Sequence, residues 1–75
     1  MTQIYTLSIK AARIENGFTQ SSLAKKIGVT KRTIGMWENG EQEMKPYALY
    51  ALAYVFGMDA EQIRLPVLRN GHAQE

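Results

Sequence analysis

The side chains of this chain best suited to a chemical task are basic, and most lie in its first half. Positions 10 to 32 hold six Lys or Arg residues and one acidic residue, whereas positions 33 to 63 hold one Lys and five acidic residues. Such an uneven distribution orients a molecule in the field of a polyanion, so it favours phosphate binding. The alternative is that the charges only keep the surface solvated. The six basic residues are Lys10, Arg13, Lys25, Lys26, Lys31 and Arg32.

The groups that catalysis or metal binding requires are not gathered in the sequence. Cysteine is absent, and the single histidine, His72, lies in a polar tail without a Cys or a second His near it. We find no nucleophile paired with a base, no paired carboxylates and no glycine-rich phosphate loop. We therefore expect no catalytic residue, no metal and no cofactor, and an enzyme is the least favoured class of function.

The apolar content of the chain fits a small cytoplasmic domain. Its apolar runs, such as residues 51–58, are far shorter than the roughly 20 residues of a membrane-spanning helix. Because a chain of 75 residues without cysteine has no disulfides, its stability has to come from helix packing, to which dimerisation can add. We expect a cytoplasmic protein with no membrane contact.

Two short amphipathic segments, residues 20–27 and 31–39, carry most of these basic residues and must hold them in place. In each segment apolar residues recur on one helical face, and a Thr directly before it can accept a hydrogen bond from a first-turn amide. A glycine follows the first segment, where a left-handed residue is favourable. The residues concerned are Leu23, Ala24 and Ile27 in the first segment, Ile34 and Trp37 in the second, the caps Thr19 and Thr30, and Gly28.

This pattern resembles the helix-turn-helix of the Xre/Cro/lambdoid phage repressor family, over most of the chain from about Leu7 to Ile63. The resemblance implies a lambda-repressor-like fold, an internal ion pair between Arg13 and Glu38, and binding of double-stranded DNA by the second helix of the motif. The residues that carry it are Thr19-Gln20, Leu23-Ala24, Gly28-Val29-Thr30, Ile34, Trp37 and Glu38-Asn39-Gly40.

Three further helices complete the prediction of an all-α, compact five-helix domain. Apolar residues at helical spacing predict the first helix over residues 7–16. Pro46 is expected to open the fourth helix, since proline is tolerated in a first turn, and Gly57 to close it. Asp59 is expected to cap a short fifth helix that carries Ile63.

The second helix of a helix-turn-helix places its N-terminal residues nearest the base edges of the major groove. Residues on its outward face are left to contact bases, with phosphate contact or plain solvation as alternatives. Gly35 lowers the stability of this helix by about 1 kcal/mol relative to Ala, and it offers no side chain to a base. Either it lets another group approach closely, or the helix reads DNA weakly. The predicted base-contacting residues are Lys31, Arg32, Thr33 and Met36.

Phosphate contacts are expected near the ends of helices. Gln20 opens the first helix of the motif, where its side chain and the adjacent amides can donate to an anion. Asn39 resembles the family residue that contacts the DNA backbone beyond the recognition helix. Lys10 and Lys45 are weaker candidates. The acidic loop at residues 40–45 departs from the family and lowers the DNA affinity that we expect.

A stripe of tyrosines on the fourth helix lies on a face beside its predicted core residues. These side chains either cap the edge of the core or form a protein interface, where Tyr is common. We assign residues 1–64 to the helix-turn-helix domain and residues 65–75 to a C-terminal tail, partly apolar and then flexible, that extends the patch. The predicted interface residues are Tyr47, Tyr50, Tyr54, Leu65, Val67 and Leu68.

The sequence therefore predicts a sequence-specific DNA-binding transcriptional regulator of the Cro or repressor type, from a phage or prophage. It would act as a homodimer on an inverted-repeat operator, without a separate ligand-sensing domain. The alternative is an antirepressor or antitoxin-like regulator of the same fold that docks on another protein, such as a repressor, because fold alone does not decide function.

Overall fold

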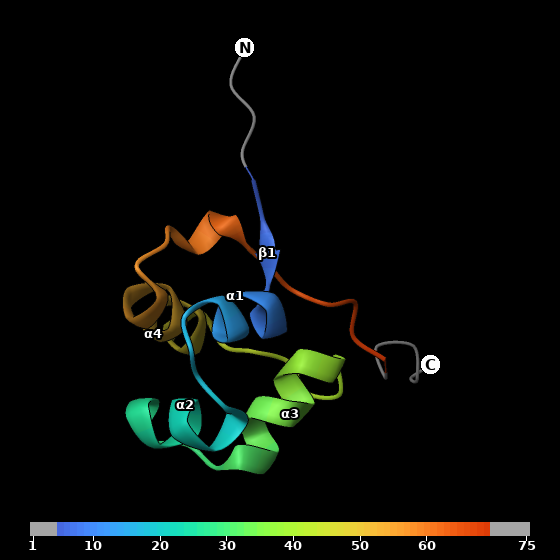
Figure 1. The fold of residues 1–75 in the computed structure, drawn as a ribbon. Helices are drawn as coiled ribbons and strands as arrows, with labels where there is room; N and C mark the ends of the chain where they lie inside the picture. Colours follow the sequence, from blue (N-terminus) through green and yellow to red (C-terminus); the bar gives the residue numbers. More distant parts are fainter. Residues whose placement is uncertain (1–4, 70–75) are drawn as a thin grey trace.

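Four α-helices, one 3-10 turn and two very short strands make up the computed structural model, which describes residues 5–69 (Figure 1). The predicted flexible end of the tail and His72 lie outside these residues. The elements in chain order are β1 (Leu7–Ser8), α1 (Ile9–Glu15), α2 (Gln20–Ile27), α3 (Lys31–Asn39), α4 (Pro46–Phe56), the 3-10 helix η1 (Ala60–Gln62) and β2 (Ile63–Arg64).

The helices of the predicted motif have the predicted bounds because their capping residues act as expected. The Thr19 hydroxyl accepts a hydrogen bond from the amide of Ser22 at 2.9 Å, and the Ser22 hydroxyl accepts one from the amide of Thr19 at 2.9 Å. At the start of α3, the Thr30 hydroxyl accepts from the amide of Thr33 at 3.1 Å. Gly28 ends α2 in the left-handed conformation at φ 82°.

The first helix starts two residues later than predicted. Ser8 has an extended backbone, and its hydroxyl accepts a hydrogen bond from the amide of Ala11 at 3.1 Å, which makes Ser8 the N-cap. Leu7 and Ser8 instead form β1, which pairs in parallel with β2 in the register Leu7 to Ile63. The expectation of a purely helical chain is therefore wrong at this point.

The predicted fifth helix is a single 3-10 turn, so five α-helices is also wrong. The amide of Asp59 donates to Oε1 of Gln62 at 2.9 Å, which closes the turn at its start. Ile63 then leaves helical geometry at ψ 119° and joins β2, where it is buried in the core. Arg64 donates from Nη1 to the Thr6 carbonyl and hydroxyl, at 3.3 and 2.9 Å, and so holds the strands together. The residues after η1 therefore pair with β1 instead of continuing as a helix.

The core lies where the inner faces of the helices meet β2. Pro46 begins α4 and Gly57 ends it at φ 68°, both as predicted. The rings of Phe18 and Phe56 lie 6.3 Å apart between centroids. No helix within residues 5–69 combines the length and apolar character that crossing a membrane requires. The buried apolar residues are Ile9, Ala12, Leu23, Ala24, Ile34, Trp37, Ala48, Leu52, Ala53, Phe56 and Ile63.

After β2 the chain returns across the molecule to the C-terminal end of α3 (Figure 1). The amide of Arg69 donates to the carbonyl of Gly40 at 2.7 Å. Gly40 is buried at φ 75°, and a Cβ added there would lie only 2.4 Å from the carbonyl oxygen of Val67. Residues 65–69, which we call the C-terminal strap, thus pack against the cap of α3, and the close approach requires glycine at position 40.

Candidate nucleic-acid interface

Helix α3 is attached to the domain by one face and leaves its first turn open to solvent. Ile34 is fully buried and Trp37 is 6% exposed, so the inner face is set by these two side chains. Lys31 and Arg32 are exposed at the start of the helix. This is the end of a recognition helix that lies nearest base edges in a helix-turn-helix complex.

The other two predicted base-contacting residues are less accessible. Thr33 and Met36 are half-buried. The Thr33 hydroxyl lies 2.9 Å from the hydroxyl of Thr30, with which it shares a hydrogen bond at the cap of α3. Contact of Thr33 with a base would therefore have to compete with its role at the helix start. Lys31 and Arg32 are the two exposed residues among the four predicted to contact bases.

A charged network joins α3 to α1 and α2. Nε of Arg13 lies 2.6 Å from Oε2 of Glu38, and Nη2 lies 3.3 Å from Oε1, so the contact is bidentate. The remaining guanidinium nitrogen donates to the carbonyl of Phe18 at 3.0 Å. Gln20 adds a hydrogen bond from Nε2 to Oε1 of Glu38 at 3.0 Å. The side chains of Arg13 and Glu38 are only 10% and 4% exposed, so the network fixes the orientation of α3 from the interior.

The predicted phosphate-contacting residues lie on separate elements. Gln20 is half-buried, and its side-chain amide is directed to Glu38 by the hydrogen bond just described. Asn39 is exposed at the last residue of α3, Lys10 is exposed on α1, and Lys45 is exposed directly before α4. The structure thus gives Gln20 an internal role that the sequence did not indicate, because its partner lies 18 positions away.

Comparison with known families agrees with this geometry. A family model described as helix-turn-helix matches residues 9–63, which include α1 to α4. The chain belongs to the helix-turn-helix family. Helix-turn-helix domains bind DNA, and the family is one of DNA-binding regulators rather than of enzymes. In residues 5–69 of this helix-turn-helix protein, no group of three or more His, Cys, Asp or Glu side chains is placed to hold a metal ion.

One curated relative is similar over part of the chain. It is antitoxin HipB of Escherichia coli (strain K12), which is 53% identical over 32 residues. The match covers 43% of this chain and 36% of the relative, so the chain spans about a third of that protein. No solved structure gives a significant match.

Gly35, the unusual residue of the recognition helix, lies beside Gln20. A Cβ added at Gly35 would meet only Nε2 of Gln20 within 4 Å, at 3.7 Å, which is ordinary van der Waals distance. The described part of the chain therefore does not need glycine at this position, either for space or for a left-handed backbone.

Replacing Gly35 by Ala is expected to stabilise this helix-turn-helix protein. Alanine lowers the conformational cost of the helix by about 1 kcal/mol, which corresponds to an increase in Tm of about 4–8 °C in a domain of this size. Thermal unfolding followed by circular dichroism measures the change. The matched control is Gly28→Ala, which places a Cβ at φ 82° and should lower Tm. A lower Tm for Gly35→Ala would show that Gln20 does need the space.

The loop after α3 carries the acidic residues that depart from the family pattern. Oε2 of Glu41 lies 3.9 Å from Nη1 of Arg69, and the two side chains are 43% and 64% exposed. Contacts of this kind contribute little to stability. They do place an arginine beside Glu41, which offsets part of the negative charge at this end of α3.

The predicted interface residues are among the most exposed apolar side chains of the described chain. Tyr47, Tyr50 and Tyr54 are 76%, 64% and 88% exposed on α4, so they cover little of the core. Val67 is 89% exposed, and Leu65 and Leu68 are about two-fifths exposed in the strap. Helix α4 contains no charged residue along its 11 positions.

Proposed function

We propose that this protein is a sequence-specific transcriptional regulator that reads DNA through α3 and acts as a homodimer on an inverted-repeat operator. The observation that carries the proposal is the buried network of Arg13, Gln20 and Glu38, which holds α3 so that Lys31 and Arg32 remain exposed at its first turn. Arginine and lysine donate to O6 and N7 of guanine in the major groove.

The homodimer would place two copies of α3 in successive major grooves, about 34 Å apart. A dimer bound over a promoter would exclude RNA polymerase by occupying its site. The tyrosine stripe of α4 supports an interface on this domain, since aromatic residues are enriched in such contacts.

A titration of the protein with the DNA upstream of its own gene tests the proposal directly. The same duplex with a scrambled sequence serves as the control, and both are titrated at two salt concentrations. We expect the upstream duplex to bind at least about 1,000-fold more tightly than the scrambled one, the lower end of the range for specific regulators. Equal affinity for the two would contradict sequence-specific recognition.

Base readout and phosphate contact are expected to respond differently to mutation. Arg32→Ala should weaken binding to the preferred operator by about 1–3 kcal/mol and relax the preference at one base position. Lys10→Ala should weaken binding to all sequences alike and lower the salt slope by about 1. Selection from randomised duplexes, followed by salt titration, separates the two effects. An unchanged base preference for Arg32→Ala would remove Arg32 as a reader.

A second candidate function is docking on another protein, as an antitoxin-like regulator. The exposed tyrosines on a helix without charge favour it, and the similar protein HipB is named an antitoxin. Under this function the DNA titration would give no preference for the upstream duplex, and the tyrosine stripe would bind a different chain rather than a second copy.

The tyrosine stripe is expected to hold the homodimer together. Tyr50→Glu should yield a folded monomer, because it places a charge in an interface that would otherwise be apolar. Its operator binding should be much weaker, since each half-site then has to capture a protomer separately. Sedimentation at matched concentration measures the mass. Tyr5→Glu is the control, since Tyr5 is 79% exposed and lies outside α4. A dimer that survives Tyr50→Glu would place the interface elsewhere.

A further inference from the structure

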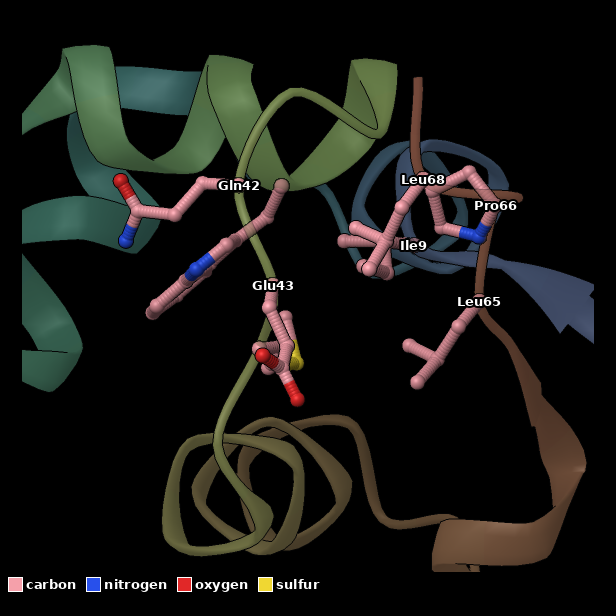
Figure 2. A pocket seen from close by; sticks show the side chains of 8 residues that line it. Ile9, Gln42, Glu43, Leu65, Pro66 and Leu68 are labelled. Carbon is pink, nitrogen blue, oxygen red and sulfur yellow. The ribbon is translucent and has the colours of Figure 1, made fainter. Parts of the chain in front are cut away.

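A pocket of about 280 Å³ lies between α1, the end of α3, the loop that follows α3, and the C-terminal strap. Figure 2 shows Glu43 on the loop side of the opening, with Leu65, Pro66 and Leu68 of the strap across from it. The complete lining is Ile9, Trp37, Gln42, Glu43, Met44, Leu65, Pro66 and Leu68. None of the predicted DNA-contacting residues is among them.

The lining is mostly apolar, with the polar side chain of Gln42 and a single charge, that of Glu43. Ile9 and the indole of Trp37 are buried in the core, whereas Glu43 is exposed. Within residues 5–69 the Glu43 carboxylate has no hydrogen-bond or ion-pair partner. An unpaired carboxylate attracts a cation, and here it stands at the edge of an apolar surface.

The size of the pocket restricts the molecule that it can hold. An apolar cavity of about 150 Å³ accepts benzene, so a volume of 280 Å³ admits one ring with a short side chain.

We propose that this pocket binds a small organic amine, consisting of one apolar ring and a short chain that ends in an ammonium group. The ring would lie among Ile9, Trp37 and Leu65, and the ammonium group would lie toward Glu43 at the opening. Since Trp37 belongs to α3 and Gly40 caps that helix under the strap, the occupant contacts the end of α3 that lies opposite Lys31 and Arg32.

Three probes of matched shape and different charge test the proposal: 2-phenylethylamine, ethylbenzene and 3-phenylpropanoate. The chain has one tryptophan, Trp37, so its fluorescence reports on the pocket directly. We expect 2-phenylethylamine to change this fluorescence in a saturable way and to raise Tm. Ethylbenzene should bind about two- to fivefold more weakly, as expected for loss of one exposed ion pair, and 3-phenylpropanoate more weakly still.

Two pairs of variants separate the charge from the cavity. Glu43→Gln should remove the advantage of the amine over ethylbenzene, whereas Glu61→Gln, an exposed carboxylate in η1, should keep it. Leu65→Phe should weaken all three probes by filling the pocket. Val67→Phe should not, because Val67 is in the same strap but is not part of the lining.

Absence of any saturable change with all three probes at millimolar concentration would overturn the pocket as a ligand site. Equal affinity for the three would overturn the choice of an amine. Persistence of the amine's advantage in Glu43→Gln would overturn the role of that carboxylate. The titrations contain no DNA, so their result does not depend on whether the proposed operator binding is correct.

Discussion

Trp37→Ala is expected to unfold much of this domain near physiological temperature. The indole is 6% exposed and packs with Ile34 on the inner face of α3, and removal of a buried aromatic side chain costs about 3–5 kcal/mol. Domains are stable by about 5–15 kcal/mol in total. For a chain of this size the loss corresponds to a decrease in Tm of more than about 12 °C. Thermal unfolding followed by circular dichroism is the measurement, since the variant has no tryptophan.

Trp37→Phe provides the matched control, because it keeps a ring but removes the indole N–H. Within residues 5–69, Nε1 of Trp37 is buried without a hydrogen-bond partner, and a buried unpaired donor costs about 1–3 kcal/mol. Relief of that cost should offset part of the packing lost with the smaller ring. We expect Trp37→Phe to be much closer to the parent in Tm than Trp37→Ala. If the alanine variant had the same Tm as the parent, our assignment of the inner face of α3 would be wrong.

The elements that could be predicted from the sequence are those whose limits are set by neighbouring residues. Thr19 and Thr30 cap α2 and α3 through hydrogen bonds that span three positions, and Pro46 and Gly57 bound α4 through their own backbone preferences. Signals of this range lie within a short window of sequence, so the bounds of these helices follow from residue type and spacing alone.

The elements that could not be predicted depend on contacts between distant parts of the chain. Leu7 fits the helical spacing of the residues after it, yet it lies in β1 and pairs with Ile63 of β2. Two residues are too few to show the alternation of a strand. The same pairing draws Ile63 out of the helix that Asp59 was expected to begin. Local pattern and tertiary pairing compete here, and the pairing prevails because it buries Ile63.

The candidate site also combines features that the local sequence predicts with features that depend on distant contacts. The exposed positions of Lys31 and Arg32 follow from the helical period once Ile34 and Trp37 face inward. Two other contacts could not be predicted from the helical period: the hydrogen bond from Gln20 to Glu38 and the close approach of Val67 to Gly40. Each joins residues at least 18 positions apart. The family resemblance supplied the pairing of Arg13 with Glu38, which no local pattern in this chain contains.

Glu38→Ala is expected to be strongly destabilising, at about 3–5 kcal/mol, because it leaves the guanidinium of Arg13 buried without its counter-charge. The double variant Arg13→Met, Glu38→Met should be more stable than Glu38→Ala, since apolar side chains of similar volume remove both charges together.

Denaturant unfolding of the parent and of Glu38→Ala measures the predicted loss. The same measurement on Arg13→Met, Glu38→Met and their combination gives the coupling energy between the two positions. Glu15→Met, which removes an exposed carboxylate from α1, controls for the loss of one negative charge. We expect the double variant to lose less stability than the sum of the two single losses, because Arg13 and Glu38 stabilise each other. Single losses that simply add would contradict a stabilising ion pair between α1 and the end of α3.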